Sequence, residues 1–416
     1  MRSRDMLVLR AFAIVALLAA CQPLPDGPSN SPADISPTPA LTRALATPAG
    51  VATTTPAATP PRVGITPLPA EPTSETDAGY LVVYSDTART ESAMAALMEQ
   101  RPGLEAETYT LSSQDIYLQL LDDLQRSQPI ADLYLAGDAP RTLSLLVDGL
   151  VLNSVPEDVR PSLPPTEREP LLTHHWTALT WVLSSAASDA PAPDNWWDLT
   201  TRAWRGRVVL PDPTVDERTL LLLATSAQHS DALANAYAQR FGREIVLDPD
   251  CPSAAYQWVK DLLSNEAQLV LTDADVLAAL GAADTERPLV GLCGSEQWEK
   301  AQRNEIALRP LLEMTPSAGL LWRSYLALVA GSKHTSAAQE AIAWLMGDDT
   351  GGGGYGVWFK PGFYPARDDV PDPAGAPPRD KLAASLWELE QAAVDAHLTP
   401  MRDLVAPYVG RPVGGR

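Results

Sequence analysis

The sequence has few cysteines and few basic residues. It contains three Cys among 416 residues, and its 31 Lys and Arg stand against 52 Asp and Glu, which gives a formal net charge of −21. A surface with this excess of negative charge repels the phosphates of nucleic acid and of anionic lipid headgroups. We therefore expect no nucleic-acid partner.

The chain also lacks the short motifs of several enzyme classes. It has no G-x-S-x-G, H-E-x-x-H or G-x-x-x-x-G-K-[ST] pattern, and these mark nucleophile elbows, zinc peptidases and phosphate loops. The run Gly351–Gly354 follows no expected strand and has no Lys at phosphate-loop spacing, so we expect a flexible surface excursion there. The sequence thus predicts no enzyme, no cofactor and no metal site. An exported hydrolase or lyase is the weakest alternative.

Long apolar runs are equally scarce. Ala11–Ala20 is an unbroken apolar run, but a membrane-spanning helix needs about 20 such residues. Three Arg precede it, which together with small residues at its end predicts a secretory signal peptide over 1–20. Leu18-Ala19-Ala20-Cys21 resembles a bacterial lipobox, which implies that Cys21 is lipidated. We expect an exported chain anchored to the lipid membrane through Cys21, facing the outside or the periplasm. The alternative is an ordinary signal peptide with a chance Cys.

The next segment, 21–78, begins with this anchor and continues as a run of Pro, Thr, Ala and Ser. Such a composition offers little apolar surface to bury and no period that predicts a helix or strand. Pro-rich chain extends by about 3.1 Å per residue, so the segment can hold a domain on the order of 100 Å from a membrane. We expect a disordered tether.

The remaining Cys, Cys251 and Cys293, lie in the part that follows the tether. Export brings them into a compartment that permits disulfides. A bridge between them closes a loop of about 43 residues, for which chain entropy predicts about 4 kcal/mol. We expect this disulfide, and two buried free thiols are the alternative.

From residue 79 onward, short β-rich runs alternate with helical patterns. This order predicts an α/β fold with largely parallel sheets flanked by helices. Ligands in open α/β sheets bind outside the carboxyl ends of the strands. The loops at these ends supply most of the candidate binding residues, which are Ser85, Asp86, Thr87, Gly137, Asp138, Asp212, Thr214, Thr272 and Asp273. Because Ser, Thr and Asp are also preferred helix N-caps, capping alone is the competing interpretation of each loop.

Several segments resemble the extracellular solute-binding proteins of ABC importers, in the branch that includes ferric-iron binders. The most specific is NWWDLTTRAWRGRVVLPDPT, which is similar to the Trp-Asp-Leu, Trp-Arg-Gly-Arg and Asp-Pro pattern of that family. YLVVYSDTARTESAMAALMEQRPGLEAE is similar to its opening strand, loop and helix, and FYPARDDV to its closing segment. The resemblance extends over most of residues 79–370.

The resemblance implies a two-lobed type II periplasmic-binding-protein fold, hinged by crossing strands. Lobe one would comprise 79–178, lobe two 179–307, and 308–416 would return to lobe one and end in C-terminal helices. It also implies a monomer that closes on a solute by hinge motion and delivers it to an ABC permease. Trp176 and Ser317 join the candidate residues of the cleft. A ligand sensor or scaffold that kept the fold without transport is the alternative.

The nature of the solute is less well indicated. Asp86, Asp138, Asp212 and Asp273 at strand ends favour a cationic solute, either a small molecule or a metal complex. The ferric binders carry adjacent tyrosines, whereas none of the 11 Tyr here are adjacent. We expect His174 and His175 to point to opposite faces of a strand and not to form a chelating pair. Most of the 11 Trp are expected in the core, although Trp176, Trp181 and Trp322 are candidates for stacking on a ring or sugar.

Overall fold

The computed structural model describes residues 79–126, 130–137, 139–184, 192–284 and 287–410. The expected signal peptide, Cys21, the tether and Asp138 lie outside these residues. Within them, the strands belong to one continuous twelve-stranded sheet whose main path runs β2-β1-β3-β10-β5-β8-β6-β7. None of the described helices is long and apolar enough to cross a membrane.

Lobe one is built on the parallel strands β1 (Tyr80–Ser85), β2 (Glu105–Thr110) and β3 (Leu133–Ala136). Successive residues of β1 alternate between its two faces. Leu81 and Val83 pack with helices α1 (Arg89–Gln100) and α10 (Thr335–Leu345). Val82 and Tyr84 pack with α2 (Ser113–Gln125) and α3 (Ala139–Val147) on the other face. Helices on both faces bury β3 and all of β1 except Tyr80, as the alternation in sequence predicts, whereas the edge strand β2 stays partly exposed.

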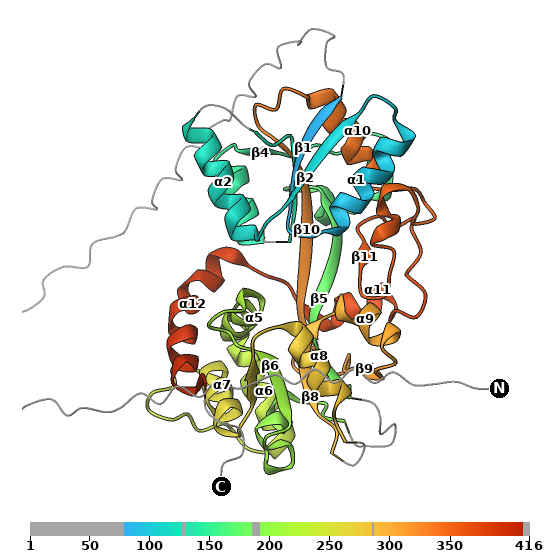
Figure 1. Ribbon diagram of the computed structural model, residues 1–416. Helices are drawn as coiled ribbons and strands as arrows, with labels where there is room; N and C mark the ends of the chain where they lie inside the picture. The colour runs from blue at the N-terminus through green and yellow to red at the C-terminus, as the bar shows by residue number, and fades with distance from the viewer. Residues whose placement is uncertain (1–78, 127–129, 138, 185–191, 285–286, 411–416) are drawn as a thin grey trace, which may run out of the picture. The chain divides into compact units, whose positions relative to one another are not determined.

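Two long strands belong to both lobes. They are β5 (Thr173–Ser184) and β10 (Gly319–Val329), which pair with each other antiparallel. β10 pairs with β3 of lobe one, whereas β5 pairs with β8 (Val290–Gly294) of lobe two. Figure 1 shows both strands running from one lobe into the other. They form the crossing connection that the resemblance implied.

Lobe two is built on the parallel set β8, β6 (Val208–Pro211) and β7 (Gln268–Val270). One face packs on α5 (Glu217–Gln228) and α7 (Ala254–Ser264), and the other on α8 (Asp273–Gly281). Helix α6 (Ser230–Phe241) packs beside α7. The described chain also contains the short elements β4 (Val151–Leu152), η1 (Arg160–Ser162), α4 (Pro165–Arg168), η2 (Trp196–Thr200), η3 (Arg202–Trp204), α9 (Gln297–Arg303), β9 (Leu308–Pro310), β11 (Tyr364–Pro365), α11 (Arg379–Ser385), β12 (Leu386–Trp387) and η5 (Ala406–Tyr408).

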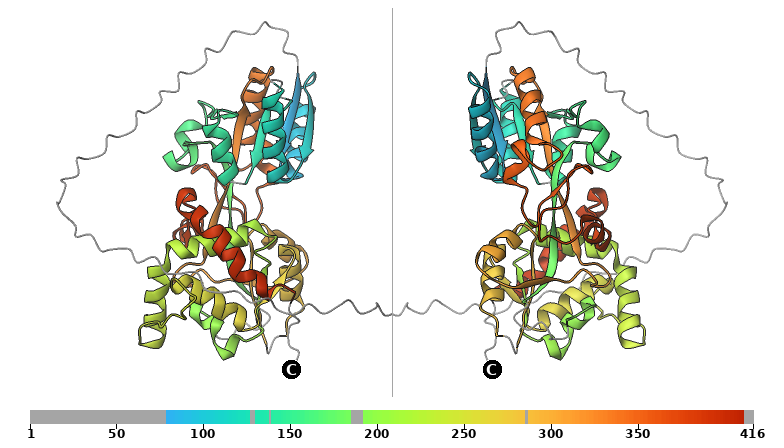
Figure 2. Two further views of the ribbon diagram at one scale, coloured as in Figure 1. Left: turned by 90° about the vertical axis from the view of Figure 1, so that its left-hand side faces the viewer. Right: turned by 90° about the vertical axis from the view of Figure 1, so that its right-hand side faces the viewer.

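The C-terminal helix α12 (Gln391–Val405) packs on lobe two, although the segment 308–416 first returns to lobe one through β10. Val394, Met401 and Val405 are fully buried in the same cluster as α5 and α7. Both views in Figure 2 show this helix, in red, beside the helices of lobe two. It therefore contributes to the core of lobe two.

The expected disulfide is wrong, because both cysteines are buried free thiols. Cys251 packs in the cluster on the α5 and α7 face of the lobe-two sheet, whereas Cys293 on β8 packs with Val276 and Leu280 of α8. Alternate residues of a strand point to opposite faces, and Leu292 occupies the face that Cys251 shares. The sheet itself separates the two sulfur atoms.

The expectation for the Gly-rich run is also wrong. It leads into a 3₁₀ turn, η4 (Gly353–Val357), that packs tightly on α10. A Cβ at Gly354 would lie 2.4 Å from the backbone oxygen of Trp344, so the missing side chain permits this close approach. Tyr355 and Trp358 behind the run are buried. The glycines serve packing rather than flexibility.

Candidate functional site

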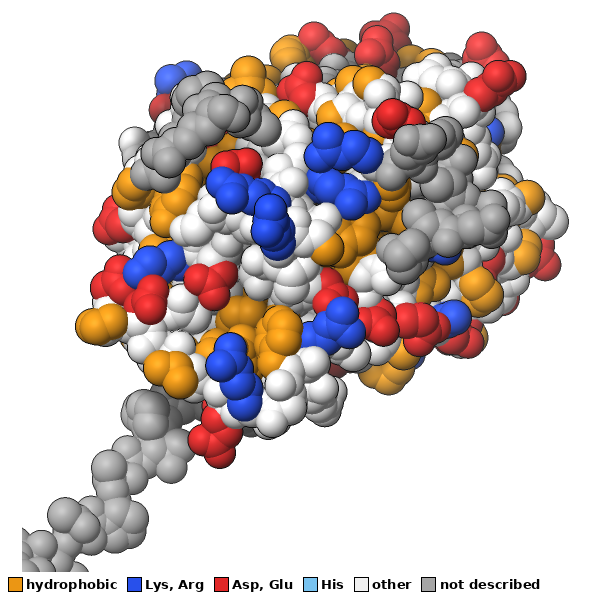
Figure 3. Space-filling view, turned by 90° about the horizontal axis from the view of Figure 1, so that it is seen from below, with side chains coloured by type: hydrophobic (Ala, Val, Ile, Leu, Met, Phe, Trp, Pro, Cys, Tyr) orange, Lys and Arg blue, Asp and Glu red, His pale blue; other side chains and the backbone are white. Residues whose placement is uncertain are grey.

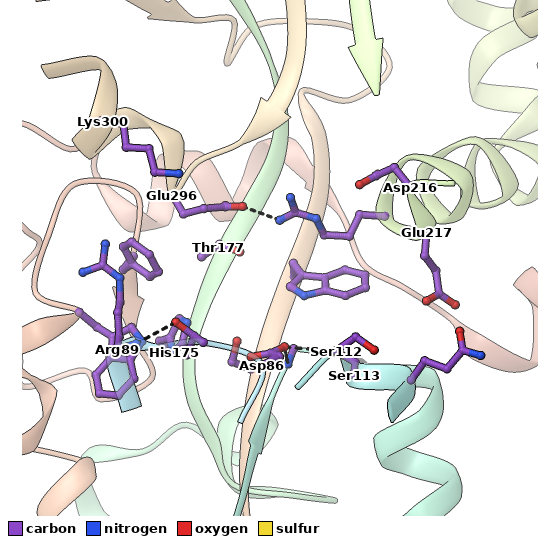
Figure 4. Close-up of a pocket in the computed structure, with 18 residues that line it drawn as sticks. Asp86, Arg89, Ser112, Ser113, His175, Thr177, Asp216, Glu217, Glu296 and Lys300 are labelled. Atoms are coloured by element: carbon purple, nitrogen blue, oxygen red, sulfur yellow. Dashed lines mark hydrogen bonds and ion pairs between the residues drawn. The ribbon is translucent and has the colours of Figure 1, made fainter. Parts of the chain in front are cut away.

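A cavity of about 570 Å³ lies where the two lobes face each other. Lobe one contributes the ends of its strands and the first turns of its helices, namely Asp86, Thr87, Arg89, Ser112, Ser113, Gln114 and Gly137. Lobe two contributes Asp216, Glu217, Arg218, Glu296 and Lys300. The crossing strands and the segment after η4 supply the remaining wall, which comprises His175, Thr177, Trp322, Ser324, Trp358 and Phe363 (Figure 4).

Of the candidates predicted at the strand ends, three line this cavity: Asp86, Thr87 and Gly137. The carboxylate of Asp86 accepts hydrogen bonds from the backbone N–H of Gly137 at 2.7 Å and from the hydroxyl of Ser113 at 3.2 Å. It thereby ties the loops after β1 and β3 to the start of α2. Ser85 lies just beneath the wall, where its hydroxyl is 2.7 Å from that of Thr90 and fully buried.

Gly137 is required by its neighbour on β10. A Cβ at this position would lie 2.5 Å from Nε1 of Trp322. Real Cβ atoms do not approach other heavy atoms so closely, so only Gly allows the indole to lie against this loop. Of the three Trp suggested for stacking, Trp322 alone reaches the wall. Trp181 is fully buried in the core, and Trp176 stacks on Tyr364 with ring centroids 4.3 Å apart.

The remaining strand-end candidates that the structure describes, and Ser317, are engaged in other contacts, and none of them lines the cavity. One Asp212 oxygen accepts from the backbone and the hydroxyl of Thr214, both at 2.8 Å. Thr272 forms a capping box with Asp275 at the start of α8. The hydroxyl of Ser317 donates to the backbone oxygen of Gly319 at 2.8 Å. For these residues the structure follows the capping and turn interpretation.

An ion pair with Arg218 holds the side chain of Asp273 away from the cavity wall. The guanidinium of Arg218 binds Glu296 at 2.7 Å and also pairs with Asp273. Burial raises the pKa of Asp273 to about 6, against the attraction of Arg218, which lowers it. One oxygen each of Asp273 and Glu296 is buried without a hydrogen-bond partner. The triad therefore holds two carboxylates around one guanidinium, with Arg218 and Glu296 on the cavity wall and Asp273 behind them.

Two ion pairs join elements on either side of the cavity. Arg141 of α3 binds Glu217 of α5 at 2.6 Å. Arg89 of α1 binds Glu299 of α9 at 2.5 Å, and its guanidinium also lies 4.6 Å from the centre of the Phe363 ring. Both pairs connect a helix of lobe one to a helix on the lobe-two side. They bridge the two sides of the cavity in the described conformation.

Sequence reasoning missed several wall residues. Glu296 and Lys300 belong to the stretch 281–310, to which the family resemblance assigns no role, and in the structure α9 carries Lys300. Within the described residues, the amino group of Lys300 has no hydrogen-bond or ion-pair partner. Trp358 and Phe363 follow the Gly-rich run, for which the sequence predicts a surface excursion. These two large aromatic residues were the available signal that the segment is buried, because a solvent-exposed excursion is not expected to carry them.

The prediction that His174 and His175 point to opposite faces of a strand is wrong, because their rings share one side of β5. Their Nδ1 atoms lie 2.8 Å apart. On β10, Ser324 pairs with His175 and Tyr325 with Thr173, so His174 is an extra residue in β5. Such a bulge interrupts the alternation of a strand. His174 packs on Tyr355 and Trp358, and His175 packs on Phe363 and lines the cavity.

The crossing strands, the helix-flanked sheets and the cavity between lobes define a two-lobed binding-protein architecture, the type II periplasmic-binding-protein fold. No protein-family model and no curated protein matches the sequence. Solved structures confirm the fold expected from the resemblance. Iron-bound HitA from Pseudomonas aeruginosa matches with a TM-score of 0.58 at 17% identity, over 80% of this chain and 99% of that one.

Two further structures match in the same way. The substrate-binding protein of an ABC transporter from Agrobacterium tumefaciens has a TM-score of 0.59 at 12% identity, over 80% of this chain and 95% of its own. AfuA from Actinobacillus pleuropneumoniae, a periplasmic binding protein with fructose-6-phosphate bound, has a TM-score of 0.56 at 15% identity, over 80% of this chain and 98% of its own. At these identities the likeness concerns the fold.

Proposed function

We propose that this protein captures a small solute between its two lobes outside the cytoplasm and delivers it to an ABC permease. The observation that carries the proposal is the cavity of about 570 Å³ between the lobes, which β5 and β10 join. Sites for small molecules typically have volumes of roughly 300–1,000 Å³. Lobes joined by crossing segments can open and close around a solute by hinge motion.

The wall chemistry supports a polar organic solute. Ser112, Ser113 and Gln114 offer hydroxyl and amide groups on one side, while Trp322 and Phe363 offer aromatic surface. Sites of this kind orient a ligand through a few polar groups and bury the rest against apolar walls.

The charges favour a solute with an anionic group. Arg89 and Arg218 are already paired with carboxylates, whereas Lys300 is unpaired among the described residues. The carboxylates that suggested a cationic solute are engaged: Asp86 accepts two hydrogen bonds, and Asp273 is paired with Arg218. Sugar phosphates have both the hydroxyl groups and the anionic group, and fructose-6-phosphate in AfuA is one of them. A cationic solute on Asp86 and Glu296 is the competing outcome.

A thermal-shift screen of the full chain tests whether the solute is anionic or cationic. The panel contains sugar phosphates, free sugars, amino acids, polyamines, divalent metals and ferric complexes. A solute at about 100 times its dissociation constant adds about 2.7 kcal/mol to the free energy of unfolding, a shift of several degrees. We expect stabilisation by sugar phosphates, and stabilisation only by polyamines or metals would reverse the charge assignment. No stabilisation by any compound would contradict capture and favour a scaffold.

The variant Lys300→Ala tests the anionic subsite directly. We expect it to weaken sugar-phosphate binding by about tenfold or more, because one charge-assisted hydrogen bond is lost. Lys381→Ala is the matched control, since Lys381 pairs with Glu313 on the surface and does not line the cavity. Equal affinities in both variants, measured by calorimetry, would remove Lys300 from the site.

Anchoring is part of the same proposal. The lipobox-like Leu18–Cys21 and the segment behind it support attachment of a monomer to the membrane surface, with the lobes outside. Detergent-phase partitioning of the chain expressed in a bacterium tests this, with Cys21→Ser as the control. Recovery of both forms in the aqueous phase would contradict the anchor.

A further inference from the structure

The hydrogen bonds of His174 determine which of its nitrogens carries a proton. Nε2 of His174 lies 2.9 Å from the backbone oxygen of Leu345. A carbonyl oxygen only accepts, so Nε2 must donate. Burial lowers the pKa of His174 to about 4, so the ring is neutral at physiological pH and its Nδ1 carries a lone pair.

This lone pair in turn orients His175. The two Nδ1 atoms are 2.8 Å apart, and a contact between two lone pairs would be repulsive. Nδ1 of His175 must therefore carry the hydrogen and donate it to His174. Burial, with His174 and Arg89 nearby, holds the pKa of His175 well below its usual range, so its ring is neutral as well. The lone pair of His175 then resides on Nε2.

Nε2 of His175 is open to the cavity. It has no hydrogen-bond partner among the described residues, and it is not sealed from solvent as the indole nitrogen of Trp358 is. Figure 4 shows His175 on the same side of the cavity as Arg89, close to Thr177. The crossing strand thus presents an acceptor to the space that a solute would occupy.

We propose that Nε2 of His175 accepts a hydrogen bond from a neutral hydroxyl or N–H group of the solute, and that His174 is the positioning residue that fixes this orientation. The proposal rests on the proposed function, and it adds that the solute brings a donor to this wall. The nearby guanidinium of Arg89 disfavours an ammonium here, because both groups are positive. A polyhydroxylated solute satisfies the acceptor without this repulsion.

The proton positions can be measured without any solute. A long-range ¹⁵N–¹H correlation spectrum of the labelled full chain distinguishes protonated from unprotonated ring nitrogens, and the chain has only five His. We expect a protonated Nε2 for His174 and a protonated Nδ1 for His175, with assignments from His174→Gln and His175→Gln. A protonated Nε2 on His175 would overturn the proposal.

Acylation with diethyl pyrocarbonate is the second measurement, because the reagent attacks accessible unprotonated imidazole nitrogens. We expect modification of His175 but not of His174, whose two ring nitrogens are both hydrogen-bonded and buried. His334 is the positive control, since its ring is partly exposed beside Asp132. Peptide mass spectrometry reads each site, and a protected His175 beside a modified His334 would contradict the open acceptor.

Binding then separates this proposal from the proposed function. For a hexose phosphate, we expect His175→Phe to weaken binding by about tenfold, because the ring shape is kept and the acceptor is lost. Unchanged affinity would contradict the role of His175 while leaving solute capture intact. If no compound binds the wild-type chain, capture fails, and the nitrogen assignments still decide whether the acceptor exists.

Discussion

Gly137 shows how a single missing side chain shapes the site. Its backbone N–H reaches Asp86, and its lack of a Cβ lets Trp322 lie against the loop. Sequence reasoning placed Gly137 and Asp86 correctly on the wall because both follow parallel strands, whose ends converge. It had no means of finding Trp322 as their neighbour, because that contact joins residues far apart in the chain.

Substitution of Gly137 by Ala should therefore disturb the cavity. The added Cβ would lie 2.5 Å from Nε1 of Trp322, and overpacking of this kind costs about 1–3 kcal/mol. We expect a lower midpoint of thermal unfolding and altered Trp fluorescence. Gly356→Ala is the matched control, because its nearest neighbour would be 4.0 Å away. Equal destabilisation by both changes would mean that the Trp322 contact does not matter.

The two histidines predict a pH dependence of stability. His174 has a pKa of about 4 when folded and about 6.5 when unfolded, so the unfolded chain binds the extra proton between these values. Stability is therefore complete above pH 6.5 and falls as the pH drops towards 4, by about 3 kcal/mol for His174 alone. In His174→Gln, which can still donate to Leu345, we expect a smaller loss. Denaturant titrations at pH 7 and pH 4 measure the difference, and parallel losses would contradict it.

At the scale of elements, the bulge in β5 had the largest effect that the sequence could not predict. The alternation of a regular strand puts neighbouring side chains on opposite faces. One extra residue, His174, breaks this alternation and brings two imidazoles together. Bulges have no sequence signature here, because they depend on how β5 pairs with β10. The strands and helices themselves were predictable from the alternation of β-rich runs and amphipathic segments.

The hydrogen bonds at the starts of the helices explain which candidate residues line the cavity. Asp86 lies on a loop whose helix begins without a side-chain cap, so its carboxylate is available to other loops. The side chains of Thr272 and Asp212 already accept hydrogen bonds from backbone N–H groups of the turns in which they lie. Lys300 reaches the wall only because α9 packs beside α8, which is a tertiary contact. Local propensity therefore identifies the loops but not which loop side chains remain available.

Helix α12 should be essential to lobe two. Met401 is fully buried in the core that it shares with α5 and α7. We expect Met401→Ala to lower the free energy of unfolding by about 2–5 kcal/mol, as is typical of buried large-to-small changes. Arg402→Ala, on the exposed side of the same helix, should have little effect. Urea unfolding compares them, and a small loss for Met401→Ala would mean that α12 is only loosely attached.

At the scale of the whole molecule, one face of the surface shows how the charges are distributed. The face in Figure 3 carries acidic and basic side chains close together, without a single-sign field over that face. The net charge of −21 is therefore expected to act on solubility more than on steering a partner to this face. We expect the balance between open and closed lobes to depend instead on local ion pairs across the cavity.

The pair Arg141–Glu217 provides a test of this balance. Partly exposed ion pairs contribute about 0.2–1 kcal/mol, so the loss of one shifts an open–closed equilibrium by up to about fivefold. We expect Glu217→Gln to increase the radius of gyration measured by small-angle X-ray scattering. Raised salt should have the same effect on the wild-type chain. Glu266→Gln, which breaks a surface pair within lobe two, is the control and should leave the radius unchanged.

The continuity of β5 and β10 also limits how this architecture can be divided. Each strand contributes one half to each lobe, so a cut between lobes would have to pass through the middle of both strands. Neither lobe is a self-sufficient module that could be excised, exchanged with a relative or expressed alone. New binding specificity in such a chain must therefore arise by replacing side chains and loops around the cavity, while the two-lobed frame is inherited as a unit.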